Sequence, residues 1–122
     1  MEKIFVNHTN HPSARWGDEQ LTAAKNFGEL VDVPFPAINP AASSEEIREL
    51  VWANAEKILS LEPAAVLCQG EFNYTFEMVE RLKNFGVKVL AATSERIVRE
   101  EILPDGSSRS ISTFRFVQFR EY

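Results

Sequence analysis

The stretch Pro63-Ala64-Ala65-Val66-Leu67-Cys68-Gln69-Gly70-Glu71 decides the fold. Its uninterrupted apolar run, residues 64–68, is typical of a central strand in a parallel sheet, because such a strand is buried on both faces. The run lies between two helix-like segments, and Pro63 separates it from the first of them. The sequence therefore predicts an α/β fold built around this strand.

Strand-like and helix-like segments alternate along the rest of the chain. Ser43 and Glu46 have the spacing of a capping box at a helix start, and Gly28 is a good C-terminal cap for an earlier helix. Pro104-Asp105-Gly106 is a turn signal between two extended runs, and the second run changes phase after Phe116, which predicts a bulge or a twist. We expect strands at about 3–7, 29–35, 64–68 and 87–92, and helices at about 18–28, 43–60 and 76–86.

This order predicts one α/β domain over residues 1–122. We expect a single Rossmann-like domain with a mainly parallel sheet, helices on its faces, right-handed crossovers and a C-terminal antiparallel strand pair. No apolar stretch approaches the roughly 20 residues of a membrane span, and the start of the chain lacks the features of a secretory signal. The single cysteine, Cys68, follows Val66 and Leu67, which predicts a buried, reduced thiol in a cytoplasmic protein.

The net charge of −5 argues against a protein that binds long DNA or RNA, whose affinity comes mainly from phosphate contacts. The charge is uneven along the chain, because residues 96–122 carry 5 basic and 4 acidic side chains. All five of these basic residues are arginines, which suit bidentate recognition of phosphate and carboxylate groups. Solvated strand faces would also account for them.

Polar clusters follow three of the predicted strands. They are Asn7-His8-Thr9-Asn10-His11, Gln69-Gly70-Glu71-Phe72-Asn73-Tyr74-Thr75 and Thr93-Ser94-Glu95-Arg96. Ligands of open parallel sheets bind beyond the carboxyl ends of the strands, so we expect Asn7, Gln69 and Thr93 at one edge and the clusters in one composite site. Their hydroxyl and amide groups suit a polar, nucleotide-like ligand.

Known catalytic and cofactor motifs are missing from these clusters. The segment 69–75 lacks the spacing of a P-loop and of the GxGxxG fingerprint, so NAD is not expected. His8 and His11 are too few to form a zinc site, and no metal or other cofactor is predicted. Asn73 or Thr75 is expected to cap the helix that follows, and Glu71 and Glu95 read as solvated turn carboxylates rather than an acid/base pair.

The two tryptophans lead to different expectations. Trp52 lies within the second predicted helix, and we expect it to pack on the sheet. Trp16 follows the first polar loop, where it either stacks on a bound base or packs in the core or an interface.

The chain resembles the small standalone CRISPR-associated proteins with a CARF-like Rossmann domain. The resemblance rests on Asn7-His8-Thr9, on Gln69-Gly70-Glu71 and on Ala91-Ala92-Thr93-Ser94-Glu95-Arg96. It continues in the turn Asp105-Gly106 and in the ending Phe114-Arg115-Phe116-Val117-Gln118-Phe119-Arg120-Glu121-Tyr122, and so spans most of the chain.

The resemblance implies a protein that binds cyclic oligoadenylate, the second messenger of type III CRISPR defence, across the two-fold axis of a homodimer. The loops at 7–10 and 93–96 would contact the ligand. Some small members are ring nucleases, which linearise the messenger without metal. They use the ribose 2′-OH as nucleophile and leave a cyclic 2′,3′-phosphate.

On this reading, the candidate catalytic residues are His8, Thr93 and Arg96. His8 would move the proton, because imidazole titrates near neutral pH, and Arg96 would hold phosphate. The candidate ligand-binding residues are Asn7, Thr9, Asn10, Gln69, Gly70, Glu71, Asn73, Ser94 and Glu95. Two alternatives stay open: a cyclic-oligonucleotide-binding regulatory module without turnover, and a nucleotide-binding protein of another pathway.

Overall fold

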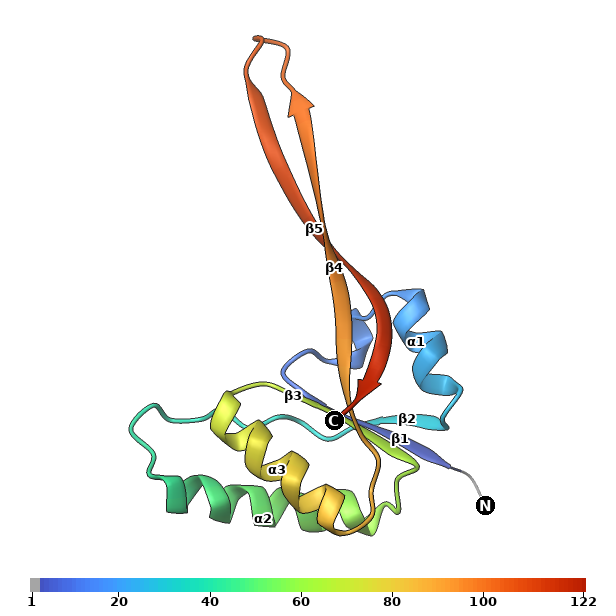
Figure 1. The fold of residues 1–122 in the computed structure, drawn as a ribbon, viewed down its shortest axis with the longest axis vertical. Helices are drawn as coiled ribbons and strands as arrows, with labels where there is room; N and C mark the ends of the chain where they lie inside the picture. Colours follow the sequence, from blue (N-terminus) through green and yellow to red (C-terminus); the bar gives the residue numbers. More distant parts are fainter. Residues whose placement is uncertain (1–2) are drawn as a thin grey trace.

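The computed structural model describes residues 3–122 and contains nine elements of regular structure (Figure 1). Three strand–helix alternations are followed by a hairpin, in the order that the sequence predicts. The elements are β1 (Ile4–Thr9), the short 3-10 helix η1 (Ser13–Arg15), α1 (Asp18–Lys25), β2 (Glu29–Asp32), α2 (Ser44–Ser60), β3 (Ala65–Gln69), α3 (Phe72–Asn84), β4 (Val89–Ile102) and β5 (Ser108–Glu121).

The strands form one sheet in the order β2-β1-β3-β4-β5. The first four strands are parallel, and β5 is antiparallel to β4. The predicted α/β class, the mainly parallel sheet and the antiparallel C-terminal pair are therefore confirmed. The chain steps outward from β1 to β2 and then returns across β1 to β3, so the strand order reverses between β1 and β3.

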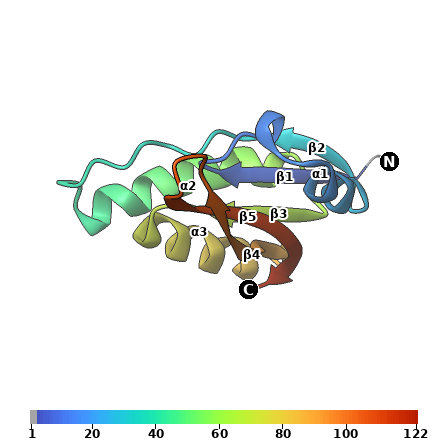
Figure 2. The same cartoon turned by 90° about the horizontal axis from the view of Figure 1, so that it is seen from above.

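Helices cover both faces of the sheet (Figure 2). On one face, α2 and α3 pack over Val6, Val66 and Val89. On the other face, α1 and the base of the hairpin enclose a smaller cluster around Phe5 and Leu67. Alternate residues of the buried strands thus serve opposite clusters, which is why the 64–68 run is apolar throughout.

The helix starts follow local capping chemistry. The predicted capping box at α2 is confirmed, since Glu46 N donates to Ser43 Oγ over 3.1 Å and Ser43 N donates to Glu46 Oε1 over 3.4 Å. At α3 the predicted cap is wrong: Glu71 Oε1 accepts from Tyr74 N over 2.7 Å and caps the helix in place of Asn73 or Thr75. A carboxylate one residue before the helix reaches the free N–H groups at its start.

The hairpin β4–β5 is longer than the sequence predicts. The strand does not end at Ala92, because β4 continues through Thr93 and Arg96 to Ile102 and pairs with β5 over its whole length. We call residues 94–116 the arm. Figure 1 shows that it projects away from the helices and the other strands, and every residue from 95 to 102 is solvent-exposed. The expectation of a loop at 93–96 was wrong because an exposed strand does not need apolar residues.

The predicted irregularity in the last strand is confirmed. Thr93 pairs with Gln118 and Ser94 pairs with Phe116, so Val117 is left without a partner in β4. This extra residue is a β-bulge at the base of the arm, and bulges bend and twist a strand pair locally. The arm therefore leaves the body of the molecule at the point where the bulge lies.

Two smaller expectations are corrected. Trp52 does not pack on the sheet: it is 50% exposed on α2, and the Arg81 guanidinium of α3 lies over its ring at 5.2 Å. Gly28 is not the cap of α1, which ends at Lys25 with Asn26 as its C-cap; any Cβ at Gly28 would clash with the Lys3 carbonyl.

Within residues 3–122, no helix combines the length and apolar character needed to cross a membrane.

Candidate functional site

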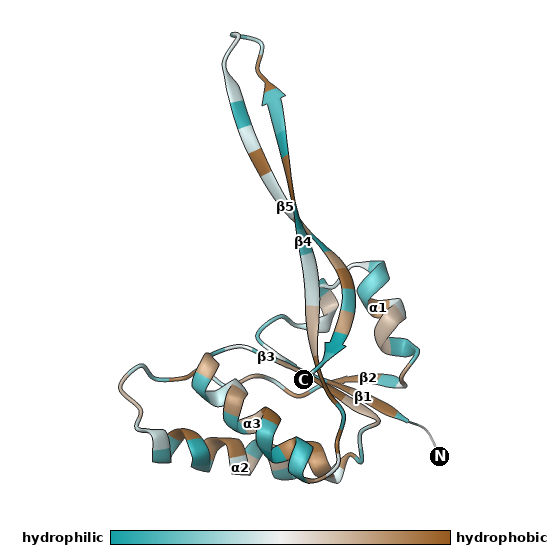
Figure 3. Cartoon of the chain, in the orientation of Figure 1, coloured by the Kyte–Doolittle hydropathy of each residue, from teal (hydrophilic) through white to brown (hydrophobic). Residues whose placement is uncertain are grey.

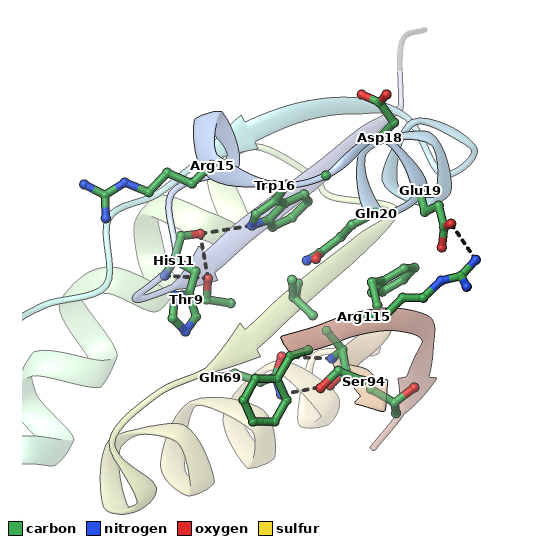
Figure 4. A pocket seen from close by; sticks show the side chains of 16 residues that line it. Thr9, His11, Arg15, Trp16, Asp18, Glu19, Gln20, Gln69, Ser94 and Arg115 are labelled. Carbon is green, nitrogen blue, oxygen red and sulfur yellow. Dashed lines mark hydrogen bonds and ion pairs between the residues drawn. The ribbon is translucent and has the colours of Figure 1, made fainter. Parts of the chain in front are cut away.

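A cavity of about 710 Å³ opens at the carboxyl ends of β1 and β3 (Figure 4). Its floor comes from the strand ends, and its walls come from η1, the N-terminal turn of α1 and the base of the arm. It lies where the strand order reverses, which is the usual ligand position in open α/β sheets. The fold thus provides one concave site at the place that the sequence predicts.

The floor of the cavity joins the three polar clusters. Thr9 and Gln69 are paired in the register of β1 and β3, and Thr93 follows directly after Ala92. The Gln69 side chain pairs with the backbone of Ala92: Ala92 N donates to Oε1 over 2.9 Å, and Nε2 donates to the Ala92 oxygen over 3.2 Å. Gln69 therefore extends the β3–β4 ladder by one side chain. Thr9, Gln69, Thr93 and Ser94 all line the cavity, as expected.

The walls bring aromatic rings and arginines to the cavity. Trp16 donates its indole N–H to the His11 oxygen over 3.1 Å, which fixes the ring against the first loop. Figure 4 shows Trp16 and Gln20 on the side of the cavity opposite Gln69 and Ser94. Phe114 and Phe116 contribute from β5. Flat rings facing hydroxyl and amide groups are suited to a ligand with both planar and polar parts.

The charges on the lining are balanced. Arg115 Nη2 lies 3.0 Å from Glu19 Oε1, in an ion pair that joins β5 to α1. The hydrogen bond that Arg115 donates to Glu19 raises the pKa of Arg115. Arg15 and Asp18 also line the cavity. The N-cap of α1 is Gly17, which has no side chain to accept from the first N–H groups. Gly17 lines the cavity, so the positive end of this helix borders it.

The side chain of Asn7 supports the first loop from below. Its Nδ2 donates to the His11 oxygen over 3.1 Å and to Asp32 Oδ1 over 3.2 Å, and its Oδ1 accepts from the Thr9 hydroxyl over 2.8 Å. The other oxygen of Asp32 accepts from Ser13 N over 3.1 Å. Asn7 is 2% exposed, so it holds the loop in place rather than projecting into the cavity.

The structure places His8 outside the cavity. Its side chain is fully buried on the sheet face that α2 and α3 cover. Nδ1 donates to the Val33 oxygen over 2.8 Å, and Nε2 accepts from the Tyr74 hydroxyl over 2.7 Å, which fits the neutral imidazole. Burial lowers the pKa of His8, and the hydrogen bond to Val33 opposes this only in part. The proton-moving role remains a prediction, and the observed contacts are those of a core residue.

The remaining expected residues lie around the cavity rather than in it. Gly70 packs under the Phe35 ring, which leaves no room for a Cβ. Asn10 and Glu71 line a separate small cavity, and Asn73 is exposed in the first turn of α3. Glu95 does not line the main cavity either. The Arg96 guanidinium bonds to Ser112 Oγ over 2.9 Å on the arm.

Several lining residues were not predicted from the sequence. Arg15, Gln20 and Arg115 reach the cavity because η1, α1 and β5 meet above the ends of β1 and β3. Phe114 and Phe116 reach the cavity from the same strand as Arg115. The alternation of the last strand placed them on a shared face, but no local signal showed that this face borders the cavity.

Few side chains in the structure suit metal binding or catalysis by a thiol. Within the part of the chain that the structure describes, no three His, Cys, Asp or Glu side chains are placed to hold one metal ion. Cys68 is buried as predicted, and this burial raises the pKa of its thiol to about 12. A thiol that stays protonated at neutral pH is a poor nucleophile.

Comparison with known proteins gives a family but no closely related protein. No curated protein and no solved structure matches the chain. One family model, described as "Uncharacterized protein MJ1673 family", matches residues 3–120. This match covers nearly the whole sequence, and the chain therefore belongs to the MJ1673 family.

Proposed function

We propose that the cavity binds a cyclic oligonucleotide, and that this ligand is a cyclic oligoadenylate shared between the two protomers of a homodimer. The observation that carries the proposal is the cavity at the reversal of strand order, with aromatic walls and a hydroxyl- and amide-lined floor. Its volume of about 710 Å³ lies within the usual range for small-ligand sites. The choice of cyclic oligoadenylate comes from the resemblance to CARF-like proteins.

Each kind of lining residue has a role in this proposal. Trp16 and Phe116 offer faces for adenine stacking, which is worth roughly 1–3 kcal/mol per base. Thr93, Ser94 and Gln20 offer hydrogen bonds to ribose and base edges. Phosphate oxygens would bind Arg115 and the N-terminus of α1, with Arg115 exchanging part of its pairing with Glu19 for the ligand.

The rate of ring cleavage would depend mainly on how the bound ligand is held relative to its own reacting groups. In a ring nuclease, the ribose 2′-OH must lie in line with the scissile phosphate, and the protein gains rate by holding this geometry. Of the three predicted catalytic residues, Thr93 lines the cavity, whereas His8 and Arg96 do not. His11 is the histidine that lines it, and it replaces His8 as the first side chain to test for proton transfer.

A non-catalytic binding module is the second candidate. It is favoured by the same walls and by the small number of acid/base groups in the lining: His11, Asp18 and Glu19. The two candidates differ only in whether product forms. A nucleotide-binding role in another pathway would show as binding of a mononucleotide in preference to the rings.

The test is calorimetric titration with cyclic tri-, tetra- and hexa-adenylate in EDTA, followed by mass analysis of the products. We expect Arg115→Ala to weaken binding at least tenfold, because it removes a charged phosphate donor. Arg99→Ala is the matched control, since Arg99 is an exposed arm arginine outside the lining. Binding that Arg115→Ala leaves intact would exclude this cavity. No binding of any ring would exclude the ligand class, and binding without product would favour the module.

A further inference from the structure

No other element of the described chain covers either face of the arm, and one of the two faces carries a self-complementary pattern of residues. Directly opposed residues of an antiparallel pair share a face, so alternate pairs of β4 and β5 define it. We call this set the arm face; its pairs are Ser94–Phe116, Arg96–Phe114, Val98–Ser112, Glu100–Ser110 and Ile102–Ser108. Val98, Ile102 and Phe114 are 56%, 81% and 72% exposed.

A two-stranded ribbon of this length is expected to pack against another part of the molecule or against a second molecule. An isolated two-stranded hairpin is marginally stable in water, and it gains stability from further strands or from packing against another layer. The opposite face of the arm supplies its own polar contacts, such as the ion pair between Arg109 Nη2 and Glu101 Oε2 at 2.8 Å. The arm face combines bulky apolar side chains with a row of serines, one of which, Ser112, accepts from the Arg96 guanidinium over 2.9 Å. Figure 3 shows hydrophilic and hydrophobic residues alternating along the strands of the arm.

We propose that the arm faces of two copies of this chain pack on each other, with the arms antiparallel and the two-fold axis at Val98. The pattern of residues carries this arrangement, because the arm face is complementary to itself about that position. Reversing the arm sets Arg96 of one copy against Glu100 of the other, and the same contact repeats on the far side of the axis. Opposite charges therefore meet twice.

Side-chain size is complementary in the same register. Phe114 meets Ser110 of the second copy, Phe116 meets Ser108, and Ile102 meets Ser94. Phe114, Phe116 and Ile102 thus each face a serine, and Val98 meets its own copy on the axis; large side chains opposite small ones favour close packing of two sheets. A shift by one pair would instead bring Arg96 against Val98, and both charge pairs would be lost.

The arrangement extends the homodimer of the proposed function. Ser94, Phe114 and Phe116 line the cavity, and Ile102 lies about 27 Å along the strand from Ser94. In the antiparallel pairing, the arm tip of the second copy reaches the cavity rim at Ser94. A role for the arm tip at the cavity rim rests on the proposed function, because it matters only if a ligand binds in the cavity.

Cysteine cross-linking without ligand tests the arrangement. The native Cys68 is buried, so the wild type should not react with a short bismaleimide. Val98→Cys should give a covalent dimer, because packed sheets lie about 10 Å apart and the two cysteines face each other on the axis. Ile97→Cys, one residue along on the opposite face and 42% exposed, is the matched control and should stay monomeric. Cross-linking of both variants or of neither overturns the proposal.

A second pair of experiments tests the register. Ile102→Cys and Ser94→Cys should cross-link when mixed and not separately. In sedimentation, Arg96→Glu or Glu100→Arg alone should raise the dimer dissociation constant at least tenfold, and the double charge reversal should restore it. Both single variants change exposed arm residues, so circular dichroism should show the fold unchanged. A dimer that all three charge variants leave unaltered would place the interface elsewhere and overturn the proposal, whatever the ligand result.

Discussion

Replacing Tyr74 with phenylalanine tests the position that the structure gives to His8. The substitution removes one hydroxyl group, which donates to Nε2 of His8 over 2.7 Å. Both side chains are fully buried, and the hydrogen bond joins α3 to β1 across 66 residues of sequence. The phenylalanine ring still fills the space against Phe35, whose ring centroid lies 4.8 Å from that of Tyr74.

The expected cost follows from the group that is left behind. The net value of a buried hydrogen bond is about 1 kcal/mol, but an acceptor left without a partner costs about 1–3 kcal/mol. Nε2 of His8 would be such an acceptor, because no water reaches it in the closed core. We therefore expect Tyr74→Phe to lower the free energy of unfolding by about 2 kcal/mol.

Urea unfolding followed by circular dichroism measures this loss. Tyr122→Phe is the control: its hydroxyl donates to the Cys68 oxygen over 2.8 Å, but Tyr122 is 42% exposed and water can replace it. The control should cost less than about 0.5 kcal/mol, as surface substitutions usually do. Equal losses of unfolding free energy in the two variants would refute the reasoning, since burial of the Tyr74–His8 hydrogen bond would then add nothing to its contribution. A changed dependence on urea would point to an altered unfolded state instead.

The buried environments of His8 and Gly70 lead to two further predictions about stability. Because burial lowers the pKa of His8, the unfolded chain binds a proton before the folded one does; stability should be complete above about pH 6.5 and fall below it by up to ~1.4 kcal/mol per pH unit. His8→Gln should flatten this slope in unfolding measured from pH 8 to 5, and an unchanged slope would contradict the assignment. Gly70→Ala should cost about 1–3 kcal/mol in the same assay, because its Cβ would clash with the Phe35 ring; a neutral result would mean that the ring can move aside.

The central architecture could be predicted because its signals are local. The apolar run at 64–68 needs only its own residues to indicate a strand buried on both faces. Ser43 and Glu46 form their capping box within one helical turn. The phase change after Phe116 lies within the strand that bulges. In each case the interaction that decides the structure joins neighbours in the sequence.

The parts that could not be predicted depend on distant residues. His8 looked like a functional histidine because nothing near it in sequence shows that Tyr74 and Val33 will bind both ring nitrogens. Arg115 lines the cavity because β5 and α1, far apart in the chain, meet there, and its ion pair with Glu19 joins them. The segment 93–96 reads as a loop because its polar residues suit one, yet a strand exposed on both faces accepts them equally well.

The hairpin also explains why the cavity and the arm face belong together. Ser94, Phe114 and Phe116 lie at the base of the arm, where they are at once the edge of the cavity and the start of the arm face. If a second copy covers that face, it also changes the rim against which a ligand binds. Binding and dimerisation would then share a free energy of coupling, so each would strengthen the other by the same factor. The bulge at Val117 sets the direction in which the arm leaves the sheet, and so places both surfaces relative to the strand ends.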